Sequence, residues 1–238
     1  MTIDHVSILR TVSDDLGRCV EANPTHPIPA CPGWTATDVL RHVGQVYAMV
    51  AAIVADRSTT YVAPGPESIP PNDGLGSWFS ERRAVMCDLL SGVDADTPVW
   101  TWSSNQTAGF YHRRMLHETV VHLGDIEHSL GRIPTVDRDV ALDGIDEFFG
   151  VVLPFALSRG RTTLPSGSLH LHCTDGEGEW MVRIEDSATR LTHEHAKGDV
   201  AWRGSASDLY FAAWGRWSTA IEALGDPTIA DQWKSVAP

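Results

Sequence analysis

Residues 111–132 have the sequence YHRRMLHETVVHLGDIEHSLGR, and the interpretation of the rest of the chain depends on this stretch. Its apolar residues recur at steps of three and four, which is typical of an amphipathic helix. They are Met115, Leu116, Val120, Leu123, Ile126 and Leu130. Gly131 is a natural helix end, and no proline occurs before Pro134. The sequence therefore predicts one long helix here, with an apolar face turned toward a core.

Glu118 and His122 lie four positions apart in this helix. Residues i and i+4 project about 40° apart on successive turns, so both side chains can reach one metal ion. His117 lies five positions before His122, roughly 140° around the helix, so this is not the zincin motif H-E-x-x-H. Most Glu/His pairs on helices are surface contacts worth about 0.3–0.5 kcal/mol. The apolar neighbours of this pair favour a buried seam, where such groups must be paired or bound to a metal.

The composition excludes several function classes. The chain has 238 residues, a net charge of −13 and only 18 Lys and Arg, which argues against a nucleic-acid partner. We find no apolar run of the roughly 18–20 residues that cross a bilayer, and the acidic N-terminus lacks the features of a signal peptide. Four scattered cysteines without a C-x-x-C motif suit reduced thiols. We therefore expect a cytoplasmic protein without a membrane partner.

The first two thirds of the chain show helical periodicity. Four helices are predicted at about 3–22, 35–56, 76–92 and 111–132, with polar or proline-rich links between them. Thr35 and Asp38 resemble a capping box at the start of the second helix, with Asp in place of the usual Glu or Gln. This pattern favours a four-helix bundle, in which metal sites are built from facing helices. His42 lies beside the apolar stripe of the second helix. Such a histidine is usually a hydrogen-bonded core residue, but here it is also the natural candidate for a third metal ligand. A fifth helix is predicted at about 138–158.

The periodicity changes to alternation in the last third. Residues 168–174 and 179–185 alternate between apolar and polar, with Asp175-Gly176 between them, which predicts a hairpin. Further strands are predicted at 189–195 and 199–203, and a long helix at 206–224. The predicted fold class is therefore α+β, with a helical bundle over residues 1–155 and a small α+β domain over residues 156–238.

Two histidine pairs in this part of the chain have strand spacing. His170 and His172 are two apart, as are His193 and His195, so each pair would share one face of a strand. A second metal site is conceivable. The interpretation that we favour from the sequence is that these residues occupy solvent-facing positions of a half-buried sheet.

Two imidazoles and one carboxylate from His42, Glu118 and His122 would suit Zn²⁺ at about 2.0–2.2 Å. Three protein ligands leave one position open, which is the pattern of catalytic zinc and lowers the pKa of a bound water or thiol. Asp125 is placed to orient a ligand histidine, and Arg114 to pair with Glu118. The motifs of serine hydrolases, phosphate-binding loops and dinucleotide-binding folds do not occur.

Two groups of motifs resemble one protein family. The first comprises CPGWT at residues 31–35, the following helix through His42, and the H-E-x-x-x-H-x-x-D pattern of residues 117–125. The second comprises RGSASDL at residues 203–209 and WGR at residues 214–216. Together they resemble the mycothiol-dependent maleylpyruvate isomerase family, part of the DinB-like superfamily. The resemblance covers nearly the whole chain, and it is more specific for the family than for a substrate.

The resemblance implies a DinB-like four-helix bundle followed by a small α+β domain. It implies a divalent metal, with zinc expected, held by His42, Glu118 and His122. This metal would activate the thiol of mycothiol, a cosubstrate of actinobacteria, for attack on a small electrophile. In the activity that names the family, the thiolate adds to the double bond of maleylpyruvate, allows rotation, and leaves as fumarylpyruvate forms. The family also uses an arginine of the second domain, for which Arg216 is the best match and Arg203 the second.

Three functions remain open on this basis. The first is cis-trans isomerisation of a maleyl-type diacid, and the second is transfer of mycothiol to an electrophile that keeps it. The third is a non-catalytic metal-binding or regulatory protein. Use of a thiol cosubstrate separates the two enzymes from the third, and regeneration or consumption of the thiol separates the enzymes from each other.

Overall fold

The computed structural model describes residues 3–62 and 69–237, which form two compact units. The first unit is Met1–Pro134 and the second is Thr135–Pro238. The division therefore falls before the boundary at residue 155 that the sequence suggested. The reason is that the fifth predicted helix packs against a helix of the second unit, and its length alone did not show this. The fold class is confirmed: a helical bundle precedes a unit built on a mixed sheet.

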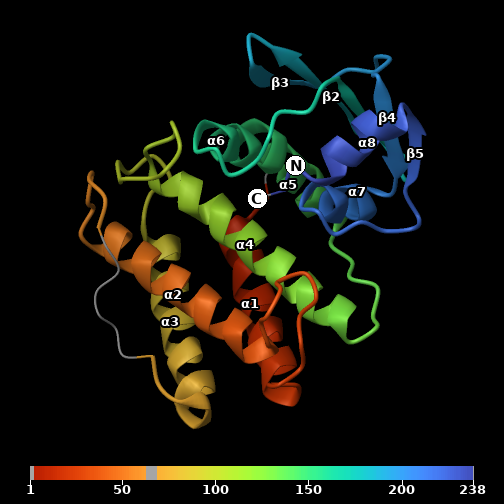
Figure 1. Ribbon diagram of the computed structural model, residues 1–238. Coiled ribbons are helices and arrows are strands. Elements are labelled where there is room, and N and C mark those ends of the chain that lie inside the picture. The colour runs from red at the N-terminus through yellow and green to blue at the C-terminus, as the bar shows by residue number, and fades with distance from the viewer. Residues whose placement is uncertain (1–2, 63–68, 238) are drawn as a thin grey trace. The chain divides into compact units, whose positions relative to one another are not determined.

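The first unit contains the four predicted helices, which lie side by side in Figure 1. Their bounds are α1 His5–Ala22, α2 Ala36–Ala55, α3 Asn72–Gly92 and α4 Ala108–Ser129. Helix α1 packs against α3 and α4, and α2 packs against α3 and α4. Their apolar stripes form the core, with Leu9, Val43 and Leu116 fully buried. This packing brings the faces of α2 and α4 together.

Local sequence signals set the ends of the helices that carry the site. The Asp38 carboxylate accepts hydrogen bonds from the N–H and the hydroxyl of Thr35, at 2.8 and 2.7 Å, so α2 begins where the capping pattern predicted. At the end of α4, Gly131 adopts φ +75° and its N–H donates to the carbonyl of His128. The N–H of Arg132 donates to the carbonyl of Glu127, which completes a Schellman motif.

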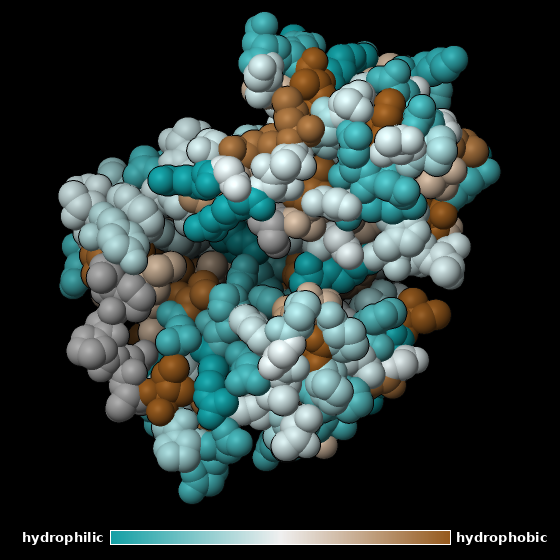
Figure 2. All heavy atoms as spheres, viewed as in Figure 1, coloured by the Kyte–Doolittle hydropathy of each residue, from teal (hydrophilic) through white to brown (hydrophobic). Residues whose placement is uncertain are grey.

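Within the described residues, α2 alone is long and apolar enough to meet a simple criterion for crossing a membrane. Core helices of globular proteins meet the same criterion, and α2 has its apolar side packed on α3 and α4. Figure 2 shows hydrophilic side chains over much of the visible face, with hydrophobic residues in small groups. The sequence alone did not indicate that α2 meets this criterion of length and hydropathy.

The second unit begins with one continuous helical segment. It consists of α5 (Arg138–Glu147), a π-helical turn at Phe148–Val152, and α6 (Leu153–Ser158), and it spans the predicted helix. The N–H of Leu153 bonds to the carbonyl of Phe148, five residues back. Pro154 follows and has no N–H of its own, and its ring would crowd the carbonyl of Gly150 in a regular α-helix. The wider turn relieves this crowding and keeps the helix intact.

A five-stranded sheet completes the second unit, in the order β3-β2-β1-β4-β5. Its strands are β1 Leu169–Cys173, β2 Glu179–Glu185, β3 Ala188–Thr192, β4 Val200–Gly204 and β5 Glu222–Gly225. β1 and β2 form the predicted antiparallel hairpin, whereas β1 and β4 are parallel. β3 ends at Thr192, so His193 and His195 lie in the following loop and not on a strand as expected.

The predicted helix over residues 206–224 is wrong in length. Helix α7 covers only Ala206–Ala213, and β5 and a short helix α8 (Pro227–Lys234) follow. Gly215 adopts φ +79°, and its N–H donates to the carbonyl of Ala212 while that of Arg216 donates to Phe211. This is a second Schellman motif, which ends the helix inside the Trp-Gly-Arg motif.

Candidate metal centre

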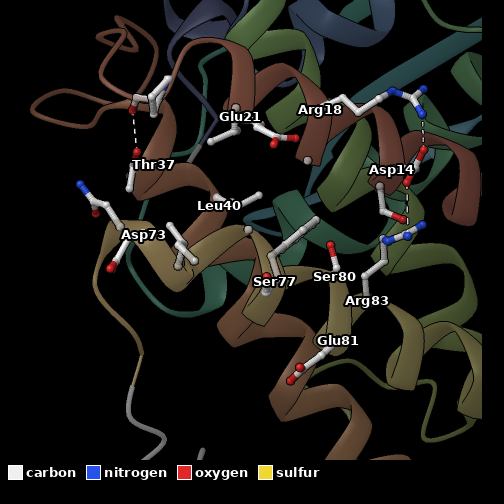
Figure 3. A pocket seen from close by; sticks show the side chains of 18 residues that line it. Asp14, Arg18, Glu21, Thr37, Leu40, Asp73, Ser77, Ser80, Glu81 and Arg83 are labelled. Atoms are coloured by element: carbon white, nitrogen blue, oxygen red, sulfur yellow. Dashed lines mark hydrogen bonds and ion pairs between the residues drawn. The ribbon is translucent and has the colours of Figure 1, made fainter.

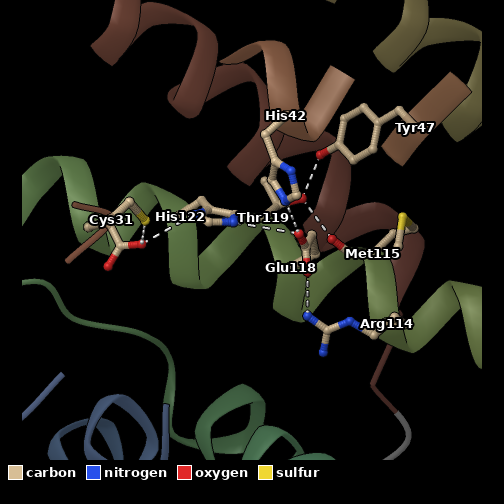
Figure 4. A network of polar contacts seen from close by, with 9 residues as sticks. Cys31, His42, Tyr47, Arg114, Met115, Glu118, Thr119 and His122 are labelled. Atoms are coloured by element: carbon tan, nitrogen blue, oxygen red, sulfur yellow. Dashed lines mark hydrogen bonds and ion pairs between the residues drawn. The ribbon is translucent and has the colours of Figure 1, made fainter. Parts of the chain in front are cut away.

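Helices α2 and α4 bring three metal-ligating side chains together (Figure 4). His42 comes from α2, and Glu118 and His122 lie one turn apart on α4. One donor atom from each lies within 4.8 Å of the other two. The His42 Nε2 atom is 2.9 Å from Glu118 Oε1, and His122 Nε2 is 3.5 Å from the same oxygen. His117 is fully buried and does not belong to this group of donors.

The spacing of these donors fits a divalent metal ion. Ligands at about 2.0–2.1 Å around tetrahedral zinc lie roughly 3.3 Å from one another. The two separations of 2.9 and 3.5 Å between the histidine Nε2 atoms and Glu118 Oε1 lie on either side of that value. The side chains of His42, Glu118 and His122 are 38%, 19% and 12% exposed. The cluster is therefore shielded on the α4 side and accessible at His42.

Two buried side chains, Arg114 and Asp125, orient Glu118 and His122 of the cluster. Arg114 Nη2 lies 2.8 Å from Glu118 Oε2, which directs the other carboxylate oxygen toward the histidines. Asp125 Oδ2 lies 3.2 Å from His122 Nδ1. A carboxylate in this position holds the proton on Nδ1 and leaves Nε2 as the ligand atom. Arg114 and Asp125 are only 5% and 2% exposed, so they are held in place by packing.

The loop before α2 adds two residues that the sequence analysis did not assign to the site. The Cys31 Sγ atom is 3.8 Å from Asp125 Oδ2. The Trp34 ring is stacked on His122 at 6.3 Å between centroids and tilted against His42 at 5.2 Å. His26 Nε2 contacts the Ser129 carbonyl at 2.8 Å and ties this loop to the end of α4. The sequence contained an indication that Cys31 and Trp34 lie at the site, because their CPGWT motif directly precedes the helix of His42.

The electrostatics among these side chains favour an ionised Glu118 carboxylate and a protonated His122 imidazole. Burial opposes the charge of Glu118, but hydrogen bonds from His122 and His42 and the charge of Arg114 hold its pKa well below the usual range. Burial likewise opposes the charge of His122, but hydrogen bonds to Asp125, Cys31 and Glu118 raise its pKa well above the usual value. A bound cation would take the place of the imidazole proton beside these carboxylates.

A buried polar contact fixes the spacing of the same two helices. The hydroxyl groups of Tyr47 on α2 and Thr119 on α4 are hydrogen-bonded, and Thr119 Oγ1 donates to the Met115 carbonyl at 2.7 Å. Tyr47 is fully buried, and this burial raises its pKa far above the usual value. The Tyr47 phenol therefore stays neutral, and its hydrogen bond to Thr119 connects α2 to α4.

Arg216, the predicted catalytic residue, lies in the second unit immediately after α7. It is half-buried, and its guanidinium donates to the Trp214 carbonyl. Arg203, the second choice, lies on β4 with its Nη1 atom 3.0 Å from Glu222 Oε2 of the neighbouring β5. Both of these side chains are exposed, so Arg203 forms a surface ion pair. The structure thus gives Arg203 a local partner, and a catalytic role for Arg216 stays a prediction.

A pocket of about 720 Å³ lies elsewhere in the first unit, between α1, α2 and α3 (Figure 3). Its charged lining includes Arg83, which lies 3.2 Å from Asp14, and Arg18, which is paired with the same residue. The residues described along its wall include none of His42, Glu118 and His122. The candidate metal-binding side chains therefore lie outside this pocket.

The fold and the cluster define a two-unit α+β protein whose helical bundle gathers two histidines and a glutamate. The model of the mycothiol maleylpyruvate isomerase N-terminal domain matches residues 7–127, and that of the C-terminal domain of the same family matches residues 139–232. The chain therefore belongs to the mycothiol-dependent maleylpyruvate isomerase family.

Solved structures show the same fold. The crystal structure of a mycothiol-dependent maleylpyruvate isomerase matches with a TM-score of 0.64 and 16% sequence identity, over 94% of each chain. A histidine-to-alanine mutant of such an isomerase matches with a TM-score of 0.61, at the same identity and coverage. Among curated protein sequences, none matches this chain.

Proposed function

We propose that this protein is a metal-dependent enzyme that activates mycothiol for attack on a small electrophile. Isomerisation of a maleyl-type diacid is the reaction that we favour. The observation that carries the proposal is the convergence of His42, Glu118 and His122 from two helices within 4.8 Å. Membership of the isomerase family supports the choice of thiol and reaction. A divalent ion held there would supply Lewis acidity that lowers the pKa of a thiol at its open position.

The residues around the cluster have separable tasks in this proposal. His42, Glu118 and His122 would hold the ion, and Asp125 would keep His122 in the tautomer that ligates through Nε2. Arg114 engages one oxygen of Glu118 and leaves the other for the ion. Trp34 packs on both histidine rings and shields them from water on that side. The half-exposed edge of His42 is the side from which a thiol would enter.

The favoured reaction conserves the thiol. The sulfur would add to the double bond of the substrate, the resulting single bond would rotate, and elimination would restore the double bond in the trans form. Arg216 is our choice for binding a substrate carboxylate, because its rigid guanidinium matches that group with two parallel hydrogen bonds. The four free cysteines fit a cytoplasmic enzyme.

Product analysis with purified protein tests this function. Maleylpyruvate is mixed with mycothiol and zinc-loaded protein, and both the product and the free thiol are followed. Isomerisation predicts a trans product with the thiol undiminished. Consumption of the thiol into an adduct would identify a transferase instead. Binding of metal without turnover of maleylpyruvate or of electrophilic test compounds would support the non-catalytic alternative.

A further inference from the structure

A second group of histidines gathers around one carboxylate in the second unit. His170 and His172 lie on β1, Glu179 on β2, and His195 in the loop that follows β3. His172 and Glu179 are directly paired across the two strands, and His170 shares their face because it is two residues from His172. Contrary to our expectation from the sequence, this is not an open polar face, since His170 is only 6% exposed.

The imidazoles converge on the two oxygens of Glu179. His170 Nε2 lies 2.5 Å from Oε2, and His195 Nδ1 lies 3.1 Å from Oε1. His172 Nδ1 also contacts Oε1. The rings of His170 and His195 are 5.2 Å apart at their centroids. One donor atom each from His170, Glu179 and His195 lies within 4.8 Å of the other two.

We propose that these residues form a second binding site for a divalent transition-metal ion, with Zn²⁺ as the expected occupant. His170, Glu179 and His195 are the ligands, a set of two imidazoles and one carboxylate that suits zinc. His172 lies outside this group of donors but contacts Glu179, so it orients the carboxylate. Three protein ligands leave a position for water or for a small molecule.

Close backbone packing holds the loop before β4 in place over the proposed site. Gly198 lies so close to β1 that an added Cβ atom would be 3.0 Å from the His170 N atom and 2.6 Å from the Val200 carbonyl oxygen. The Asp199 carboxylate then accepts from the N–H of Ser168 at 2.8 Å, which fixes the end of the loop to the start of β1. These contacts hold the loop over the buried His170.

The ligands also have the mobility that binding requires. Tetrahedral zinc spaces its ligands about 3.3 Å apart, so His170 Nε2 and Glu179 Oε2 must separate by roughly 1 Å. His195 is 77% exposed on its loop and Glu179 is 25% exposed, so both can adjust. A bound metal ion would replace the contacts of His170 and His195 to Glu179 with bonds from all three side chains to the metal, while His172 keeps its contact to Glu179. The metal would thereby hold the loop of residues 193–199 against the sheet.

The test is zinc stoichiometry on the full chain, with zinc as the probe. Because His122→Ala removes a ligand of the first cluster, that variant isolates the second site and should retain about one zinc after gel filtration. Adding His195→Asn or Glu179→Gln should abolish this remaining zinc. His172→Asn should keep the site but weaken zinc affinity by about 10–100-fold, as expected for an orienting residue. Competition with a chromophoric chelator measures the affinities.

A neighbouring histidine provides the matched control. His193 lies in the same loop and is 64% exposed, but its Nε2 atom pairs with Asp146 at 2.7 Å. In the His122→Ala background, His193→Asn should leave the zinc content unchanged. Equal loss with His193→Asn and His195→Asn would indicate adventitious binding by surface histidines and overturn the proposal. Absence of zinc in His122→Ala itself, with the circular dichroism of the wild type, would overturn it as well. The result does not depend on the proposed enzymatic function.

Discussion

His42 and Glu118 are 76 positions apart in the sequence, yet His42 Nε2 lies 2.9 Å from Glu118 Oε1. The contact joins α2 to α4 across the helical bundle, and His122 lies one turn further along α4. The carboxylate oxygen that faces both histidines is thus the central donor of the cluster. This contact gathers three side chains from two helices into one cluster of donor atoms, which is the metal site that we propose.

The first prediction concerns metal content. His122→Ala removes one of the three proposed ligands of the first cluster, and two ligands hold zinc far more weakly than three. We expect zinc at this centre to fall from near one equivalent to less than about a tenth. Elemental analysis measures total zinc, with Glu179→Gln in the background to remove the second proposed site. His128→Ala is the control, because His128 is exposed on the same helix. Full retention of zinc by His122→Ala would show that the ligand assignment is incorrect.

The second prediction concerns orientation of a ligand. Asp125→Asn keeps the shape of the side chain but removes the charge beside His122 Nδ1. Zinc affinity should fall by about 10–100-fold while the site itself remains. A chelator competition assay gives the affinity, and circular dichroism checks the fold because Asp125 is buried. Unchanged affinity would leave Asp125 with a structural role only.

The third prediction concerns Arg216. If its guanidinium binds a substrate carboxylate, Arg216→Ala should cost about 1.5–3 kcal/mol of transition-state or substrate binding, or roughly 10–100-fold in activity. Zinc content should not change, and both quantities are measured on the same sample. Arg203→Ala is measured in parallel, because Arg203 is the second match for the family's arginine. Its exposed pair with Glu222 is worth only about 0.2–1 kcal/mol of stability, so a loss of activity in this variant would assign the role to Arg203. Normal activity of Arg216→Ala would remove this residue from the site, and loss of zinc would point to a structural role.

The fourth prediction concerns pH and the start of α2. Hydrogen bonds from Thr35 lower the pKa of Asp38 below the ordinary value. A lowered pKa stabilises the fold above the unfolded pKa of about 3.9, and this stability is lost as the pH falls through the folded pKa. Asp38→Asn should therefore reduce the free energy of unfolding by about 0.5–1 kcal/mol at pH 7. Urea denaturation at several pH values gives the free energy of unfolding of both proteins. The difference between the wild type and Asp38→Asn should shrink below about pH 4. If this difference in the free energy of unfolding stayed constant with pH, the lowered pKa of Asp38 would not be its cause.

The fifth prediction concerns the packing that supports His42. Gly44 lies two residues further along α2, and an added Cβ atom would overlap the ring of Trp78 on α3. Gly44→Ala should destabilise the fold by about 1–3 kcal/mol through overpacking. Thermal denaturation followed by Trp fluorescence measures the effect. Gly76→Ala on α3 is the control, because its Cβ atom would meet open space and should be neutral or slightly stabilising. Equal effects of the two substitutions would show that the contact with Trp78 is not responsible.

The sequence by itself determined the local structure of the first unit. Periodicity, the Thr35 and Asp38 capping pattern, and Gly131 predicted the helices of the bundle, because these signals act within a few residues. The geometry of one helix was enough to place Glu118 and His122 on one face and to exclude His117. Family membership was also evident from short motifs, and the family models confirmed it.

The end of the last predicted helix was wrong although a local signal, Gly215, marks it. The helix predicted over residues 206–224 ends at Ala213, because Gly215 reverses the chain with a positive φ. Gly215 directly follows an apolar run, so it is the kind of stop signal that was used correctly for Gly131. The unit boundary is a different case. It depends on α5 packing against α7, which its own amphipathic pattern does not specify.

Only the tertiary structure decided which distant side chains meet. It brought Cys31 and Trp34 to the cluster of the first unit, and it turned His195 toward Glu179 while His193 turned to Asp146. Sequence spacing constrains neighbours within one helix or strand, because their geometry repeats every few residues. Contacts between elements depend on how whole apolar faces pack and on strand register, and these are properties of the complete fold.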